Sequence, residues 1–93
     1  MVFRTTEFLE HTALDLETLE VWIEEEWIIP SGNEAERLFS EGDLARAHFI
    51  RDLMNELGVN SEGVSVVLHL VDQVHGLRRA LSELAGPEST LKT

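Results

Sequence analysis

The spacing of apolar residues in the first third of the chain predicts two short helices separated by a turn. Residues 7–12 form the first helix, with Phe8 and Leu9 on its inward face. Asp15 is a good N-cap for the second helix, because its side chain can accept a hydrogen bond from the first turn. The buried stripe of that second helix consists of Leu19, Trp22 and Ile23. Two helices in this order, joined by a short turn, form a helix-turn-helix.

A small hairpin is predicted after the second helix. Residues 27–30 and 37–39 are β-prone runs, and they lie on either side of the turn-like cluster 31–33. Together they predict a two-stranded wing. The expected winged helix-turn-helix therefore covers residues 5–39.

A third helix is predicted over residues 40–58. Ser40 and Asp43 have the spacing of a capping box, in which each side chain satisfies the other's backbone N–H. Gly58 is a natural C-terminal stop, since glycine readily adopts the left-handed backbone that ends many helices. The apolar face of this third helix consists of Leu44, Ala47, Ile50 or Phe49, Leu53, Met54 and Leu57.

The last helix carries the most regular apolar pattern in the chain. Asn60 can cap its start, and Gly86-Pro87 is expected to end it. Apolar residues recur at intervals of three and four, the a/d spacing of a coiled coil, for almost three heptads. This seam consists of Val67, Leu70, Val74, Leu77, Leu81 and Leu84. A second strip near the start of the helix consists of Val64, Leu68 and Val71.

These two strips leave two arrangements open. Both could be buried within one chain, or one could pack on the helix-turn-helix while the seam meets a second copy. We favour a homodimer, because the seam extends beyond the length of the preceding elements. We therefore expect one domain over residues 1–86, with a dimerisation helix over residues 60–86 and a flexible tail over residues 87–93.

Charge is concentrated at one end of the chain, and this changes the functional picture. The net charge is −11, and residues 1–36 contribute −9 of it, with ten acidic residues against Arg4 alone. Six acidic residues lie between Asp15 and Glu26, where there is no Lys or Arg. Affinity for nucleic acid comes mainly from cations that displace counterions from phosphates. We therefore expect the second helix to repel DNA and to attract a basic protein.

The sequence contains no pattern that indicates catalysis or metal binding. There is no cysteine, and His69 and His75 are six residues apart rather than the four that would place both on one helix face. Glycine-rich phosphate loops and nucleophile elbows are also missing. No stretch is apolar for long enough to span a membrane. We expect a cytoplasmic protein that is not an enzyme and uses no cofactor and no metal.

From about Thr5 to Leu84 the chain resembles the winged helix-turn-helix of the MerR class. The resemblance rests on the run from Glu7 to Ile28, on Arg37-Leu-Phe-Ser40 at the wing strand, and on the order of the later helices. Within that class, the chain is most similar to the chaperone-modulator (CbpM-type) family. The similar segment is Gly58-Val-Asn-Ser-Glu-Gly-Val64, which opens a leucine-rich helix.

The chain departs from DNA-reading MerR proteins at two places in the helix-turn-helix. Glu20-Val21-Trp22 stands where that class often has an arginine followed by two aromatic residues. Ala13 stands where it has a turn glycine, so a left-handed backbone is not expected at this position. The chain also lacks cysteines after the long helix, so metal sensing of the MerR type has no ligands.

The resemblance implies a protein that binds and inhibits a DnaJ-like, curved-DNA-binding co-chaperone through its J-domain. Charge and helical geometry predict a partner-binding face that consists of Glu17, Glu20, Val21, Glu24, Glu25 and Trp27. One alternative is an adaptor for another basic protein. Another is a MerR-like DNA-binding transcriptional regulator, in which Arg37, Arg46 and Arg51 would lie near phosphates; these arginines are more simply explained as partners of nearby acids.

Overall fold

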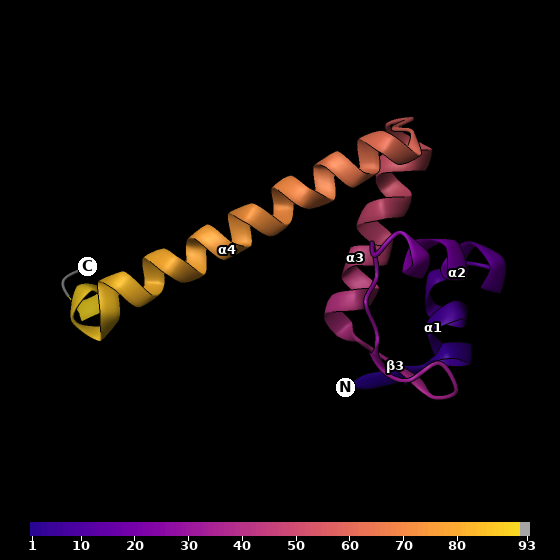
Figure 1. Ribbon diagram of the computed structural model, residues 1–93, viewed down its shortest axis with the longest axis horizontal. Helices are drawn as coiled ribbons and strands as arrows, with labels where there is room; N and C mark the ends of the chain where they lie inside the picture. Colours follow the sequence, from indigo (N-terminus) through magenta and orange to yellow (C-terminus); the bar gives the residue numbers. More distant parts are fainter. Residues whose placement is uncertain (92–93) are drawn as a thin grey trace.

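The computed structural model describes the backbone of residues 1–91 and the side chains of residues 1–85. In chain order the elements are β1 (Val2–Arg4), α1 (Thr5–Thr12), α2 (Leu16–Glu24), β2 (Ser31–Gly32), β3 (Arg37–Ser40), α3 (Glu41–Arg51), the π-helical segment η1 (Asp52–Glu56) and α4 (Ser61–Leu91). Figure 1 shows α1, α2 and α3 gathered near the small sheet, with α4 projecting away from them. The predicted fold class, mainly helical with a small sheet and a long last helix, is confirmed.

Most of the predicted helix caps are present. Asp15 Oδ1 accepts a hydrogen bond from the Thr18 backbone N–H at 2.8 Å. Hydrogen bonding from the Thr18 side chain and from its backbone lowers the pKa of the Asp15 carboxyl. Asn60 caps α4 in the same way, and Ser40 forms the expected reciprocal bonds with Asp43. α1 begins earlier than the predicted residues 7–12, at Thr5, and its N-cap is Arg4. There the Glu7 carboxylate accepts from the Arg4 backbone N–H at 2.8 Å.

The turn between α1 and α2 has a left-handed residue at Ala13, with φ of 59°. The prediction that alanine would avoid this conformation is therefore wrong. The backbone N–H of Ala13 donates to the Leu9 carbonyl at 2.8 Å and closes the end of α1. Burial of α1 and α2 against the same core requires the chain to turn here, and tertiary packing overrides the local preference of alanine.

The sheet has three antiparallel strands in the order β1-β3-β2. The predicted hairpin exists, but its first strand is Ser31–Gly32 and not residues 27–30. The earlier residues of that run include Trp27 and Ile28, which are buried in the core instead. The sequence analysis also missed β1, in which Phe3 lies opposite Phe39 of β3.

One core joins the helix-turn-helix to the sheet and to the later helices. Phe8 of α1 stacks on Phe39 of β3, with ring centroids 4.3 Å apart. The other large side chains that are fully buried are Leu19, Ile28, Ile50 and Val64. The predicted buried stripe of α2 is confirmed, with Leu19 and Trp22 buried and Ile23 packed against the same core.

The first turns of α4 are docked on this core. Val64 and Leu68 are buried, and the indole N–H of Trp27 donates to Ser65 Oγ at 2.9 Å. Arg46 of α3 forms a two-pronged ion pair with Asp72, with N–O distances of 2.9 and 3.2 Å. The strip near the start of α4 therefore packs within the chain.

The later part of α4 projects away from the domain (Figure 1). The radius of gyration is 16.0 Å, against about 12 Å for a compact chain of this length. The seam residues from Leu70 to Leu84 are consequently between 47% and 85% exposed. α4 also continues to Leu91, past Gly86-Pro87 where its end was predicted. Of the predicted tail, residues 92–93 lie outside the described part of the chain, and its flexibility stays a prediction.

We expect the substitution Ala13→Gly to raise the free energy of unfolding by about 1 kcal/mol, because glycine adopts the left-handed backbone without the steric cost of a Cβ atom. The matched control is Ala45→Gly, in which an exposed alanine inside α3 is replaced and about 1 kcal/mol is lost. Urea unfolding at one fixed protein concentration measures both. A loss of stability in Ala13→Gly equal to that in Ala45→Gly would contradict the left-handed turn.

The hydrogen bonds from Arg46 hold the pKa of the Asp72 carboxyl below its ordinary value. Stability from this pair is therefore present at pH values above the unfolded-state pKa and is lost as the pH falls through the lowered one. We expect Asp72→Asn to lower the free energy of unfolding by about 1 kcal/mol at pH 7. The loss should be smaller at acid pH, where Asp72 of the wild type is itself protonated. Urea unfolding from pH 7 to pH 3 tests this, with Glu83→Gln on the same helix as the control. A difference in unfolding free energy between the wild type and Asp72→Asn that stays constant with pH would contradict a stabilising ion pair.

Candidate functional site

The outer face of α2 is acidic and exposed. Glu17, Glu20 and Glu24 are spaced three and four residues apart, so they lie along one side of the helix. Val21 lies among them and is 51% exposed, the only apolar residue of the predicted face that is open to contact. Glu25 follows the last turn and is also exposed. The structure therefore brings together five of the six residues in the predicted face.

The prediction that Trp27, the sixth residue, belongs to that face is wrong. Its side chain is only 4% exposed and its ring lies 6.0 Å from that of Trp22, centroid to centroid. Its indole N–H is already bound to Ser65. After α2 the backbone of Glu26 has φ of 63°, and this sharp turn directs Trp27 into the core. Trp27 therefore holds α4 in place and offers no edge for a partner.

Arg37 is the cation nearest to the acidic face, and it is already paired. Its Nη1 lies 2.6 Å from Glu20 Oε1, and its side chain is mostly buried between α2 and the wing. The pair fixes β3 against α2. It also means that Glu20 contributes less free negative charge than Glu17 or Glu24.

The other two arginines of the DNA-binding alternative also have partners inside the chain. Arg46 binds Asp72 and donates from Nε to the Trp27 carbonyl. Arg51 donates from Nη1 to the Thr12 carbonyl at the end of α1. All three side chains are only partly exposed. Their positive charges join elements of the fold, and of the acidic groups on α2 only Glu20 is paired with one of these three arginines.

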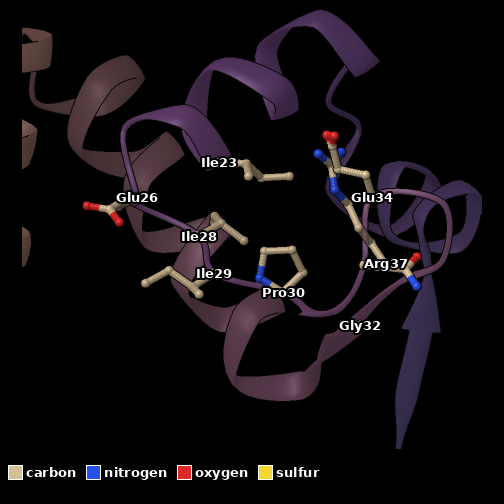
Figure 2. A pocket seen from close by; sticks show the side chains of 9 residues that line it. Ile23, Glu26, Ile28, Ile29, Pro30, Gly32, Glu34 and Arg37 are labelled. Carbon is tan, nitrogen blue, oxygen red and sulfur yellow. The ribbon is translucent and has the colours of Figure 1, made fainter.

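A groove separates α2 from the wing (Figure 2). It consists of two adjoining hollows of about 390 and 320 Å³, which share Ile23, Glu34 and Arg37. In Figure 2 the side chains of Ile23, Ile28, Ile29 and Pro30 surround the larger hollow. Glu26 lies at one end, and Glu34 and Arg37 lie at the other. The sequence did not predict this groove, because its pattern favours a strand over residues 27–30.

Two further features of the described residues bear on the site. Among the described side chains, those of residues 1–85, no three histidines or carboxylates gather closely enough to hold a metal ion. Over the same residues, no helix combines the length and the apolar character that crossing a bilayer requires. The face of α2 and the adjoining groove are thus described by charge and apolar contact alone.

Comparison with known proteins identifies the scaffold. A search of curated proteins finds no match to the chain. The family model described as MerR HTH family regulatory protein matches residues 3–85, which include the helix-turn-helix, the wing and most of α4. This agrees with the order of elements from β1 to α4. The chain therefore belongs to the MerR HTH family of regulatory proteins.

Proposed function

We propose that this protein is a MerR-type scaffold that binds the J-domain of a DnaJ-like co-chaperone and thereby inhibits the co-chaperone. The residues that contact the J-domain are those of the exposed α2 face: Glu17, Glu20, Val21, Glu24 and Glu25. Many J-domains carry a basic helix beside the loop that stimulates Hsp70. An acidic helix is complementary to such a surface, and this complementarity raises the association rate and favours the correct partner.

The observation that carries the proposal is the acidity of α2 at the position where this scaffold normally reads DNA. The helix has an exposed outer face on which three glutamates lie three and four residues apart, with the apolar Val21 among them. A duplex placed against that face would bring its phosphates close to carboxylates and gain no cations to neutralise them, which is unfavourable, most strongly at low salt. A cationic protein surface gains from the same charges.

The DNA-binding alternative has little support from the arginines on which it depends. Arg37, Arg46 and Arg51 are each engaged by an acid or a carbonyl of the same chain. A phosphate brought to Arg37 or Arg46 would compete with the Glu20 or Asp72 carboxylate that already neutralises the guanidinium. The protein-partner reading requires no rearrangement of these contacts, and we prefer it for that reason.

The proposal includes a homodimer held by the α4 seam. Leu70, Val74, Leu77, Leu81 and Leu84 are exposed on a helix that leaves the domain, and Val67 lies where they meet the core. Water-exposed leucines at a/d spacing bury one another when two such helices pair, which contributes about 1.5–3 kcal/mol for each side chain fully buried. A second copy is the occupant, because it supplies the same spacing in its own α4.

For the α2 face, we expect the double substitution Glu17→Lys with Glu24→Lys to raise the Kd for the J-domain by about tenfold or more at low salt. Glu20 is left unchanged, because a lysine there would face Arg37 and disturb the wing. Calorimetry with the J-domain of the same organism's DnaJ-like co-chaperone measures the change.

The matched control for this variant is Glu10→Lys with Glu56→Lys. Both residues are exposed and lie on α1 and η1, so the net charge changes by the same amount away from α2. If both double variants weaken binding equally, only overall charge matters and the α2 face is not the contact surface. If neither double variant weakens binding, the α2 face is likewise not the contact surface.

For the seam, we expect Leu77→Glu to shift the protein to a monomer, because a buried carboxylate at a d position of each chain loses hydration without a partner. Sedimentation equilibrium at a concentration where the wild type is dimeric measures the shift. Ser82→Glu adds the same charge five residues later on the same helix, outside the seam, and should remain dimeric. A Leu77→Glu dimer as stable as the Ser82→Glu dimer would rule out the seam as the interface.

A further inference from the structure

We infer that the groove between α2 and the wing is the apolar anchor site of the partner interface, and that it receives an apolar side chain flanked by cationic residues on a helix of the partner. This inference rests on the proposed function and deepens it. Charged contacts on α2 favour a basic partner, but affinity depends on buried apolar anchors. Val21 alone offers little such surface.

The groove has the chemistry of an anchor site. Ile29 is 71% exposed at its edge, so most of its side chain is free to contact a partner. Ile23, Ile28 and Pro30 line the same hollow. Glu26 and Glu34 lie at opposite ends of this hollow, so carboxylates border its apolar side chains (Figure 2). Glu24 lines the adjoining hollow. The single cation of the groove, Arg37, is already neutralised by Glu20.

The walls of the groove are formed before any partner binds. On the α2 side, the N–H groups of Trp27 and Ile28 both donate to the Trp22 carbonyl, at 2.9 and 3.4 Å. On the wing side, Asn33 accepts from the Glu36 backbone N–H at 2.9 Å. Gly32 has φ of 86°, and a Cβ atom there would lie 2.2 Å from the Glu36 carbonyl oxygen, so this turn requires glycine. A preformed groove costs little conformational entropy on binding.

The local structure favours a helix over a strand as the occupant. An added strand would have to pair with β2, which lies at the edge of the sheet but has only two residues. Two residues supply too few backbone groups for strand addition. A helix instead inserts single side chains, and its cationic neighbours then lie against the carboxylates that border the groove. The groove also shares Glu20 and Glu24 with the α2 face, so one partner helix can contact both.

The test uses Ile29→Ala, with Leu57→Ala as its matched control. Leu57 is 72% exposed, as open as Ile29, and it lies beyond η1 and outside the groove. We expect Ile29→Ala to raise the Kd for the J-domain by about tenfold or more and Leu57→Ala by less than about twofold. Urea unfolding of both variants checks that the fold is retained. Glu34→Lys, compared with Glu56→Lys, tests the acidic border independently and should also weaken binding.

The outcomes separate this inference from the proposed function. Tight wild-type binding that is weakened by Ile29→Ala and Glu34→Lys supports the groove as the anchor site. If the wild type binds tightly and neither variant weakens binding more than its control does, the groove is not the anchor site. The proposal for the α2 face would then still stand. If the wild type itself does not bind the J-domain, the proposed function fails, and the assignment of this occupant fails with it.

Discussion

The fold depends on Arg46 and the contacts that surround it. Its Nε donates to the carbonyl of Trp27, and its other nitrogens hold Asp72 of α4. The indole of Trp27 in turn donates to Ser65, a residue in the docked part of α4. These few polar contacts join the end of the helix-turn-helix, α3 and α4 around one buried ring. Because they fix the direction of α4, they also determine that the distal seam is presented outside the domain.

The same contacts show how a helix-turn-helix scaffold can carry an acidic outer face on α2 without losing its fold. The buried side of α2 needs Leu19 and Trp22 for packing, whereas its outer side makes few contacts within the chain. Residues on that outer side can therefore change sign at little cost to stability. Meanwhile Arg37, Arg46 and Arg51 serve as internal ties. A negative outer face is what remains, and it is the basis for proposing a basic protein partner.

Sequence patterns predicted the local features of this protein well. The caps at Asp15 and Asn60 depend on neighbouring residues only, and the exposed seam and buried strip of α4 follow from helical periodicity. Features set by distant contacts were missed. β1 forms only because β3 is there to pair with it, and Trp27 is buried because Glu26 adopts a positive φ. The groove beside Ile29 follows from that turn, so no periodic signal in the sequence marked it.

The central claim is that the acidic α2 face binds a protein and not a nucleic acid. The most direct measurement is a calorimetric titration of the wild-type protein into the J-domain of the same organism's DnaJ-like co-chaperone, at low and at moderate salt. The account predicts a saturable complex whose affinity falls as salt screens the charges on α2. No complex at either salt concentration, or an affinity that does not change with salt, would contradict it.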